Sequence, residues 1–91
     1  MIVNYIKDKE GKNLSKSAYR ILEIVEKKQI TSAKEIVSEL EISTRAIHYS
    51  LRRLVDRKIL DRKPYLEDMR QTRYSLTESI LSQYKNNGFN F

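Results

Sequence analysis

Residues 43–57, STRAIHYSLRRLVDR, constrain the possible fold more than any other stretch, because apolar and polar positions separate onto two sides of a helix. Spacings of three and four residues place one set of side chains on a common face, namely Ile47, Ser50, Leu51 and Leu54. The other face carries hydrogen-bond donors and an aromatic ring, namely Thr44, Arg45, His48, Tyr49 and Arg52. Ser43 can cap the start. The stretch predicts a helix over about 44–57 that packs by one face and can bind a partner by the other.

Two more helices are predicted before this one. Apolar residues recur at helical spacing over about 15–28, where Ser15 or Ser17 can cap the start: Leu14, Ala18, Ile21, Leu22 and Val25. Ser32 and Glu35 form an S-x-x-E capping box, which predicts a short helix over about 32–40. Ile30, just before it, is expected to lie in a strand of one or two residues.

A β-hairpin is predicted after the third helix. Residues 59–63 and 72–76 alternate partly between apolar and polar side chains, as strands do, and the polar residues 66–71 suit the tip. Pro64 restricts the first strand to an edge or an end of a sheet, because proline donates no backbone hydrogen bond.

The chain is predicted to form one domain, 1–91, whose last helix spans about 77–86 with Thr77 as its cap. Residues 1–13 fit either a short strand or a turn of helix, and they are grouped with 87–91 as terminal extensions. The predicted fold class is mainly α with a small β-hairpin (α+β), in the order α-(β)-α-α-β-β-α.

Positive charge is concentrated in one segment of the chain. The net charge is +6 at pH 7, and residues 43–73 carry nine basic side chains against four acidic ones. Seven of the eight arginines lie in that segment. Arginine's planar guanidinium suits bidentate bonding to phosphates and guanine edges. The distribution indicates an acidic partner such as nucleic acid.

Several classes of function are disfavoured by composition. The chain has no cysteine and a single histidine, His48, so we expect no metal site and no disulfide. Neither a glycine-rich phosphate loop nor converging carboxylates are present, and we expect no enzyme activity and no cofactor. The sequence also lacks an apolar run long enough to span a membrane. We expect a soluble intracellular protein, cytoplasmic and associated with the nucleoid.

The segment SAKEIVSELEISTRAIHYSLRRLVDRKIL resembles the helix-turn-helix core of bacterial and archaeal winged-helix regulators. EDMRQTRYSLTES is similar to the wing of the MarR-type branch, in which an acidic residue and an arginine two positions later precede Leu-Thr. Here those residues are Asp68, Arg70, Leu76 and Thr77. The resemblance covers about 17–79 and implies a winged helix-turn-helix, with the helix-turn-helix at about 32–57 and the wing at about 59–76.

The chain departs from the MarR-type pattern in ways that bear on its expected behaviour. Lys58 stands where such sequences usually place glycine, so the turn there is expected to be strained or shaped differently. No glycine follows Leu76 and Thr77 within the usual few residues. The chain is also far shorter than full MarR-type proteins, which use long terminal helices for dimerisation and effector binding. Its length and glycine-poor, Lys/Glu/Ile-rich composition are similar to small archaeal and archaeal-virus winged-helix regulators.

The partner implied by this resemblance is double-stranded DNA. The expected contacts from the recognition helix are Ser43, Thr44, Arg45, His48, Tyr49, Arg52 and Arg53. Those from the wing are Lys63, Arg70 and Arg73, with Asp68 implied to orient Arg70. Arg57 and Arg62 are not counted among them, because either can pair instead with Asp56 or Asp61.

A homodimer is expected, because both ends of the chain carry apolar side chains beyond what their short elements need. The candidates for its interface are Ile2, Val3, Ile6, Ile80, Leu81, Tyr84, Phe89 and Phe91. The alternative is that both ends fold over the core of the single chain. The leading function is sequence-specific transcriptional regulation. A sequence-neutral architectural DNA binder and a protein-protein interaction module remain the alternatives, and the sequence identifies no small-molecule effector.

Overall fold

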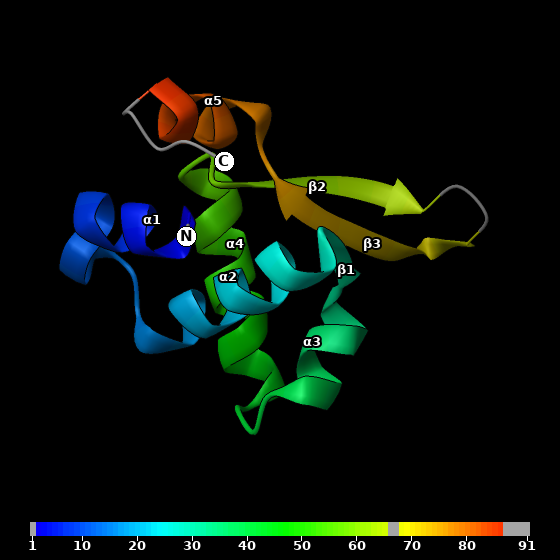
Figure 1. The fold of residues 1–91 in the computed structure, drawn as a ribbon. Helices are drawn as coiled ribbons and strands as arrows, with labels where there is room; N and C mark the ends of the chain where they lie inside the picture. Colours follow the sequence, from blue (N-terminus) through cyan, green and yellow to red (C-terminus); the bar gives the residue numbers. More distant parts are fainter. Residues whose placement is uncertain (1, 66–67, 87–91) are drawn as a thin grey trace.

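The computed structural model describes residues 2–65 and 68–86, with side chains described except at residues 64, 65 and 68–71. The elements are, in order, α1 (Ile2–Glu10), a 3₁₀ turn η1 (Gly11–Asn13), α2 (Lys16–Lys28), β1 (Ile30–Ser32), α3 (Ala33–Glu39), α4 (Thr44–Asp56), β2 (Leu60–Tyr65), β3 (Asp68–Leu76) and α5 (Glu78–Asn86). Helices predominate over a small antiparallel sheet (Figure 1), which confirms the predicted α+β class.

The three helices of the central segment begin where the sequence predicts, because each has a serine cap. In each cap the serine Oγ accepts a 3.2 Å hydrogen bond from the backbone N–H three residues later: Ala18 to Ser15, Glu35 to Ser32 and Ala46 to Ser43. The carboxylate of Glu35 has a further partner, since its Oε2 accepts a 3.1 Å bond from Thr31 Oγ1. Glu35 therefore ties the start of α3 to β1.

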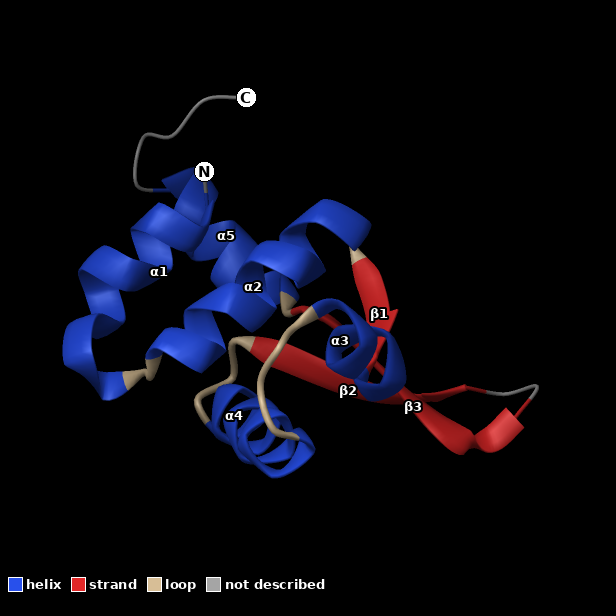
Figure 2. Cartoon of the chain, turned by 90° about the horizontal axis from the view of Figure 1, so that it is seen from below, coloured by secondary structure: helices blue, strands red, loops and turns tan. Residues whose placement is uncertain are grey.

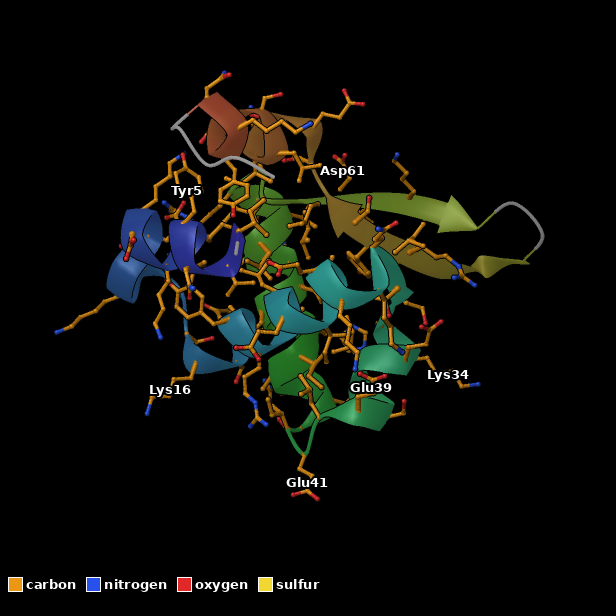
Figure 3. All side chains as sticks on the ribbon, viewed as in Figure 1. Tyr5, Lys16, Lys34, Glu39, Glu41 and Asp61 are labelled. Atoms are coloured by element: carbon orange, nitrogen blue, oxygen red, sulfur yellow. The ribbon has the colours of Figure 1, made fainter. Side chains whose placement is uncertain are left out.

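The N-terminal segment is a nine-residue helix and a 3₁₀ turn, which corrects the order predicted from sequence and the assignment of 1–13 as an extension. Ile2, Val3 and Ile6 share one face of α1 and are 5%, 7% and 0% exposed. Tyr5 lies between α1 and α5 (Figure 3), and its ring is 5.7 Å from the Tyr84 ring of α5. A segment this short gains most of its helical stability from such packing, which the local sequence cannot reveal.

The sheet has the order β1-β3-β2, with both pairs antiparallel. Pro64 lies in the edge strand β2, as predicted. The β2–β3 register shifts between Pro64, which pairs with Thr72, and Tyr65, which pairs with Asp68. Strand β3 thus begins at Asp68, and the predicted tip of 66–71 was too long. The tip was predicted from the polar character of residues 66–71. Strand pairing is made by the backbone and does not require apolar side chains, so that character gave the wrong start for β3.

Helix α4 runs through the centre of the view in Figure 1, with α2 across it and the β2–β3 hairpin projecting to one side, and Figure 2 shows that it lies at an edge of the molecule. Its buried face consists of Ile47, Ser50, Leu51 and Leu54, none more than 3% exposed. These positions are the ones that the sequence predicts to pack. Within the described ranges, no helix has the length and apolar character needed to cross a bilayer.

The turn after α4 is held by the start of α5. Lys58 has a φ of 61°, the left-handed conformation expected where related sequences place glycine. Thr77 Oγ1 donates a 2.8 Å bond to the Lys58 carbonyl and accepts a 3.1 Å bond from the Ile80 N–H. The Thr77 N–H also donates to the Ile59 carbonyl at 3.0 Å. One threonine thus caps α5 and fastens the strained turn.

Replacing Thr77 by valine should lower the free energy of unfolding by about 1–3 kcal/mol, because a buried carbonyl and amide lose their partner. Thr77 is 7% exposed, so water does not readily replace the hydroxyl. Urea denaturation followed by circular dichroism measures the change. The matched control, Thr77→Ser, keeps the hydroxyl and should lose clearly less. Equal losses in the two variants would show that the methyl group, and not the hydroxyl, matters here.

Candidate nucleic-acid interface

The outward face of α4 is exposed over its whole length. Thr44, Arg45, His48, Arg52 and Arg53 are exposed, and Tyr49 is 68% exposed. The Tyr49 ring thus lies in solvent among these polar and basic side chains, while the opposite side of α4 is buried. The amphipathic arrangement predicted for this segment is therefore present.

The β2–β3 hairpin lies beside this face and extends it. A hollow of about 650 Å³ separates α4 from the start of α3 and the hairpin. Its polar and charged lining includes Lys34, His48, Arg52, Arg62 and Thr72. The structure thus brings two predicted contacts from α4 together with Arg62, which sequence reasoning left out. Arg62 belongs to the same arginine-rich segment, and that charge was the available signal for it.

On the hairpin, Lys63 is exposed, while Arg73 points toward α3. Arg73 Nη1 lies 4.0 Å from Glu35 Oε1, and the Arg73 side chain is 26% exposed. Lys28 Nζ reaches the same glutamate at 3.6 Å and Glu39 at 2.6 Å. The hydrogen bond to Glu39 is the main cause that raises the pKa of Lys28. Arg73 therefore lies at the base of the hairpin with its side chain toward α3.

Two side-chain contacts tie the far end of α4 to the N-terminal segment. Arg57 forms an ion pair with Glu10, whose side chain is 8% exposed. Arg53 Nε donates a 3.3 Å bond to the Asn13 carbonyl. The sequence offered Asp56 or Asp61 as partners for Arg57, and the structure pairs it with Glu10, 47 positions away. Glu10 and Asn13 are thus positioning residues for α4, and no local pattern identifies them.

The Tyr19 side chain holds the η1 turn by a hydrogen bond. Its hydroxyl donates a 2.6 Å bond to the Gly11 carbonyl. Burial, and next the negative charge of Glu10, raise the pKa of Tyr19, while Arg57 lowers it. The hydroxyl therefore keeps its proton and remains a donor at neutral pH.

Most of the apolar residues considered for a dimer lie in the core of the single chain. Ile2, Val3, Ile6, Ile80 and Tyr84 are each at most 7% exposed. Leu81 differs, at 37% exposure. It borders an apolar hollow of about 630 Å³ lined also by Ile2, Val25, Leu76 and Tyr84.

Four predicted residues cannot be placed. The side chains of Asp68 and Arg70, and the residues Phe89 and Phe91, lie outside the described part of the chain. Over residues 2–65 and 68–86, no cluster of histidine, cysteine and carboxylate side chains is arranged to hold a metal ion.

Comparison with known proteins places this geometry in a family. Residues 14–79 match the family model of the winged helix DNA-binding domain. No curated protein sequence matches the chain. Among solved structures, the chain resembles ZitR of Lactococcus lactis with a TM-score of 0.69 and 26% identity, over 81% of this chain and 50% of that one. The chain therefore spans about half the length of that relative.

Two further structures share the fold at lower identity. The adhesin competence repressor AdcR of Streptococcus pyogenes gives a TM-score of 0.67 and 24% identity, over 93% of this chain and 64% of that one. A MarR mutant from E. coli, solved in complex with operator DNA, gives 0.67 and 22%, over 96% and 69%. The family model covers well over half of the chain, and the solved structures that resemble the chain are MarR-type regulators. This chain therefore belongs to the winged helix DNA-binding domain family, with a MarR-like architecture.

Proposed function

We propose that the chain is a transcriptional regulator that binds a specific double-stranded DNA sequence, with α4 in the major groove and the hairpin over the adjoining minor groove and backbone. The observation that carries this proposal is the outward face of α4, which is cationic, aromatic and exposed beside a basic hairpin. The MarR mutant of similar fold was solved with operator DNA, which supports the same class of partner.

The α4 residues divide into those that read bases and those that hold the backbone. Arg45, near the N-terminus of α4, is placed to bond both acceptors of a guanine, while His48 and Tyr49 follow it on the same face. Thr44 and the cap Ser43 lie at the leading end. Arg52 lies two turns further along and borders the hairpin-side hollow, where phosphate is the better partner.

The hairpin contributes a second, smaller set of contacts. Exposed Arg62 and Lys63 are proposed to bind phosphates. Arg70, oriented by Asp68, is proposed to enter the minor groove on the strength of the resemblance alone. Arg73 would join them only after leaving Glu35.

We also propose that two copies act together. Leu81 and the hollow beside it form one apolar surface of the described residues, and a two-fold axis there would cover both. Such a dimer would present two α4 helices about 34 Å apart, matching half-sites one helical turn apart.

A selection of bound duplexes from a random pool, at about 0.15 M salt, tests this function. Enrichment of a palindrome with half-sites one turn apart is the expected result. Tight binding without a shared sequence would contradict the regulator hypothesis and favour a sequence-neutral architectural binder, because phosphate contacts carry affinity without sequence information. Absence of binding would favour a protein-interaction module.

A further inference from the structure

A second basic surface lies on the side of α4 away from the hairpin. It consists of Lys12 in η1, Lys16 at the start of α2 and Arg53 of α4, and we call it the η1 flank. All three side chains are exposed. Viewed from below, η1 and the start of α2 lie on one side of α4 and the hairpin on the other (Figure 2).

The η1 flank is continuous with the proposed recognition face. A hollow of about 350 Å³ is lined by Lys12, Ser15, Tyr49 and Arg53, among others. An adjacent hollow of about 490 Å³ is lined by Ser15, Tyr49 and Arg45, among others. Tyr49 borders both, so a ligand that reaches Arg45 and Tyr49 also meets the η1 flank.

The lining of these two hollows suits an anion. Every polar side chain in it is a lysine, an arginine, a serine, an asparagine or a tyrosine, and none is acidic. Glu10, two residues before Lys12, is buried and paired with Arg57. The lining of the apolar hollow near Leu81, in contrast, includes an acidic side chain, Glu26. Unopposed cations beside serine hydroxyls form a phosphate-binding surface rather than a network of internal ion pairs.

The backbone around Lys12 is fixed from two directions. The Gly11 carbonyl accepts from Tyr19, and the Asn13 carbonyl accepts from Arg53. Lys12 thus lies between two held carbonyls. Arg53 uses Nε for this bond, so the bond does not occupy its two terminal amino groups. A pre-positioned backbone reduces the ordering cost of binding.

The dimensions of a duplex make this flank a natural second contact. A helix about 10–12 Å across fills a major groove about 12 Å wide, so both sugar–phosphate backbones run beside it. The hairpin side of α4 meets one of them and the η1 flank faces the other. We propose that Lys12, Lys16 and Arg53 bind phosphates of the strand opposite the hairpin, so that a single copy holds both borders of the groove. This inference rests on the DNA binding proposed above.

The test compares the salt dependence of duplex binding by the unmodified chain and by Lys12→Ala/Lys16→Ala, measured by fluorescence anisotropy on the selected duplex. Each phosphate contact contributes a slope of about 0.9 in log K against log salt. The double variant should therefore show a slope shallower by about 1.8, and lose about tenfold less affinity between roughly 50 and 200 mM salt. Its preferred sequence should not change, because phosphate contacts do not read bases.

The charge-matched control is Lys27→Ala/Lys85→Ala. Both lysines are exposed, and they lie in the last turns of α2 and α5 rather than in η1 or the first turn of α2. This variant should keep the slope of the unmodified chain. A shift of the same size in it would mean that net charge, rather than the η1 flank, is responsible.

Hydroxyl-radical footprinting supplies an independent readout. The Lys12/Lys16 variant should lose protection at one border of the site, and Lys63→Ala should lose it at the other. An unchanged slope and footprint in the Lys12/Lys16 variant would overturn this inference alone, while the proposed function would stand. If the unmodified chain bound no duplex, the proposed function would fall and this inference with it.

Discussion

Replacing Arg45 and Arg52 together by alanine is expected to weaken binding to the selected duplex about 70- to 25,000-fold. A bidentate arginine–guanine contact is worth about 1–3 kcal/mol, and a hydrogen bond to a charged group about 1.5–3 kcal/mol. Their sum corresponds to that range of dissociation constants. Both side chains are exposed, so the free energy of unfolding should stay within about 0.5 kcal/mol.

The single variants separate the two roles. Arg45→Ala should relax the base preference at one position of the site, whereas Arg52→Ala should weaken all sequences alike and make the salt slope shallower by about one. Repeating the duplex selection with each variant measures this difference. Lys27→Ala/Lys85→Ala removes the same charge elsewhere and should bind almost normally. Normal binding by the Arg45/Arg52 variant would show that α4 is not the recognition helix.

Truncating Leu54 to alanine should lower the free energy of unfolding by about 2–5 kcal/mol. Leu54 is 0% exposed and packs in the continuous core formed by α1, α2, α4 and the sheet. A domain of this size has a total stability of roughly 5–14 kcal/mol, so the loss is a large share of it. Urea denaturation should show a lower midpoint with an unchanged m value.

Tyr49→Ala is the matched control on the same helix, since Tyr49 is 68% exposed. It should leave the free energy of unfolding within about 0.5 kcal/mol while weakening DNA binding. A loss below about 1 kcal/mol in Leu54→Ala would mean that the core closes around the missing volume. That result would contradict the tight packing of α4.

The features that could be predicted from the sequence are those set by neighbouring residues. The serine caps at 15, 32 and 43 act over three positions, and the apolar stripe of α4 repeats every three or four. At Lys58 the sequence left open a strained or a differently shaped turn, and the structure has the left-handed conformation. The amphipathic recognition helix was predicted with its two faces correctly assigned.

The features that sequence reasoning missed depend on residues far apart. Helix α1 is stabilised by packing on α2 and α5, so its short segment looked equally suited to a strand. Arg57 had two acidic residues nearby in sequence, yet pairs with Glu10 because α1 brings that carboxylate to the end of α4.

The sequence by itself determined which helices form around the helix-turn-helix, where they begin and which side of α4 is exposed. Local hydrogen bonds and periodic burial determine these features, and both depend on residues that are close together in the sequence. Only the tertiary structure decided which cations remain available on that side. Packing drew Arg73 to Glu35 and Arg57 to Glu10, and it placed Lys12 beside Tyr49 and Arg53. The interaction of two charged groups depends on the distance between them, and these distances are set by elements that come together only in the folded chain.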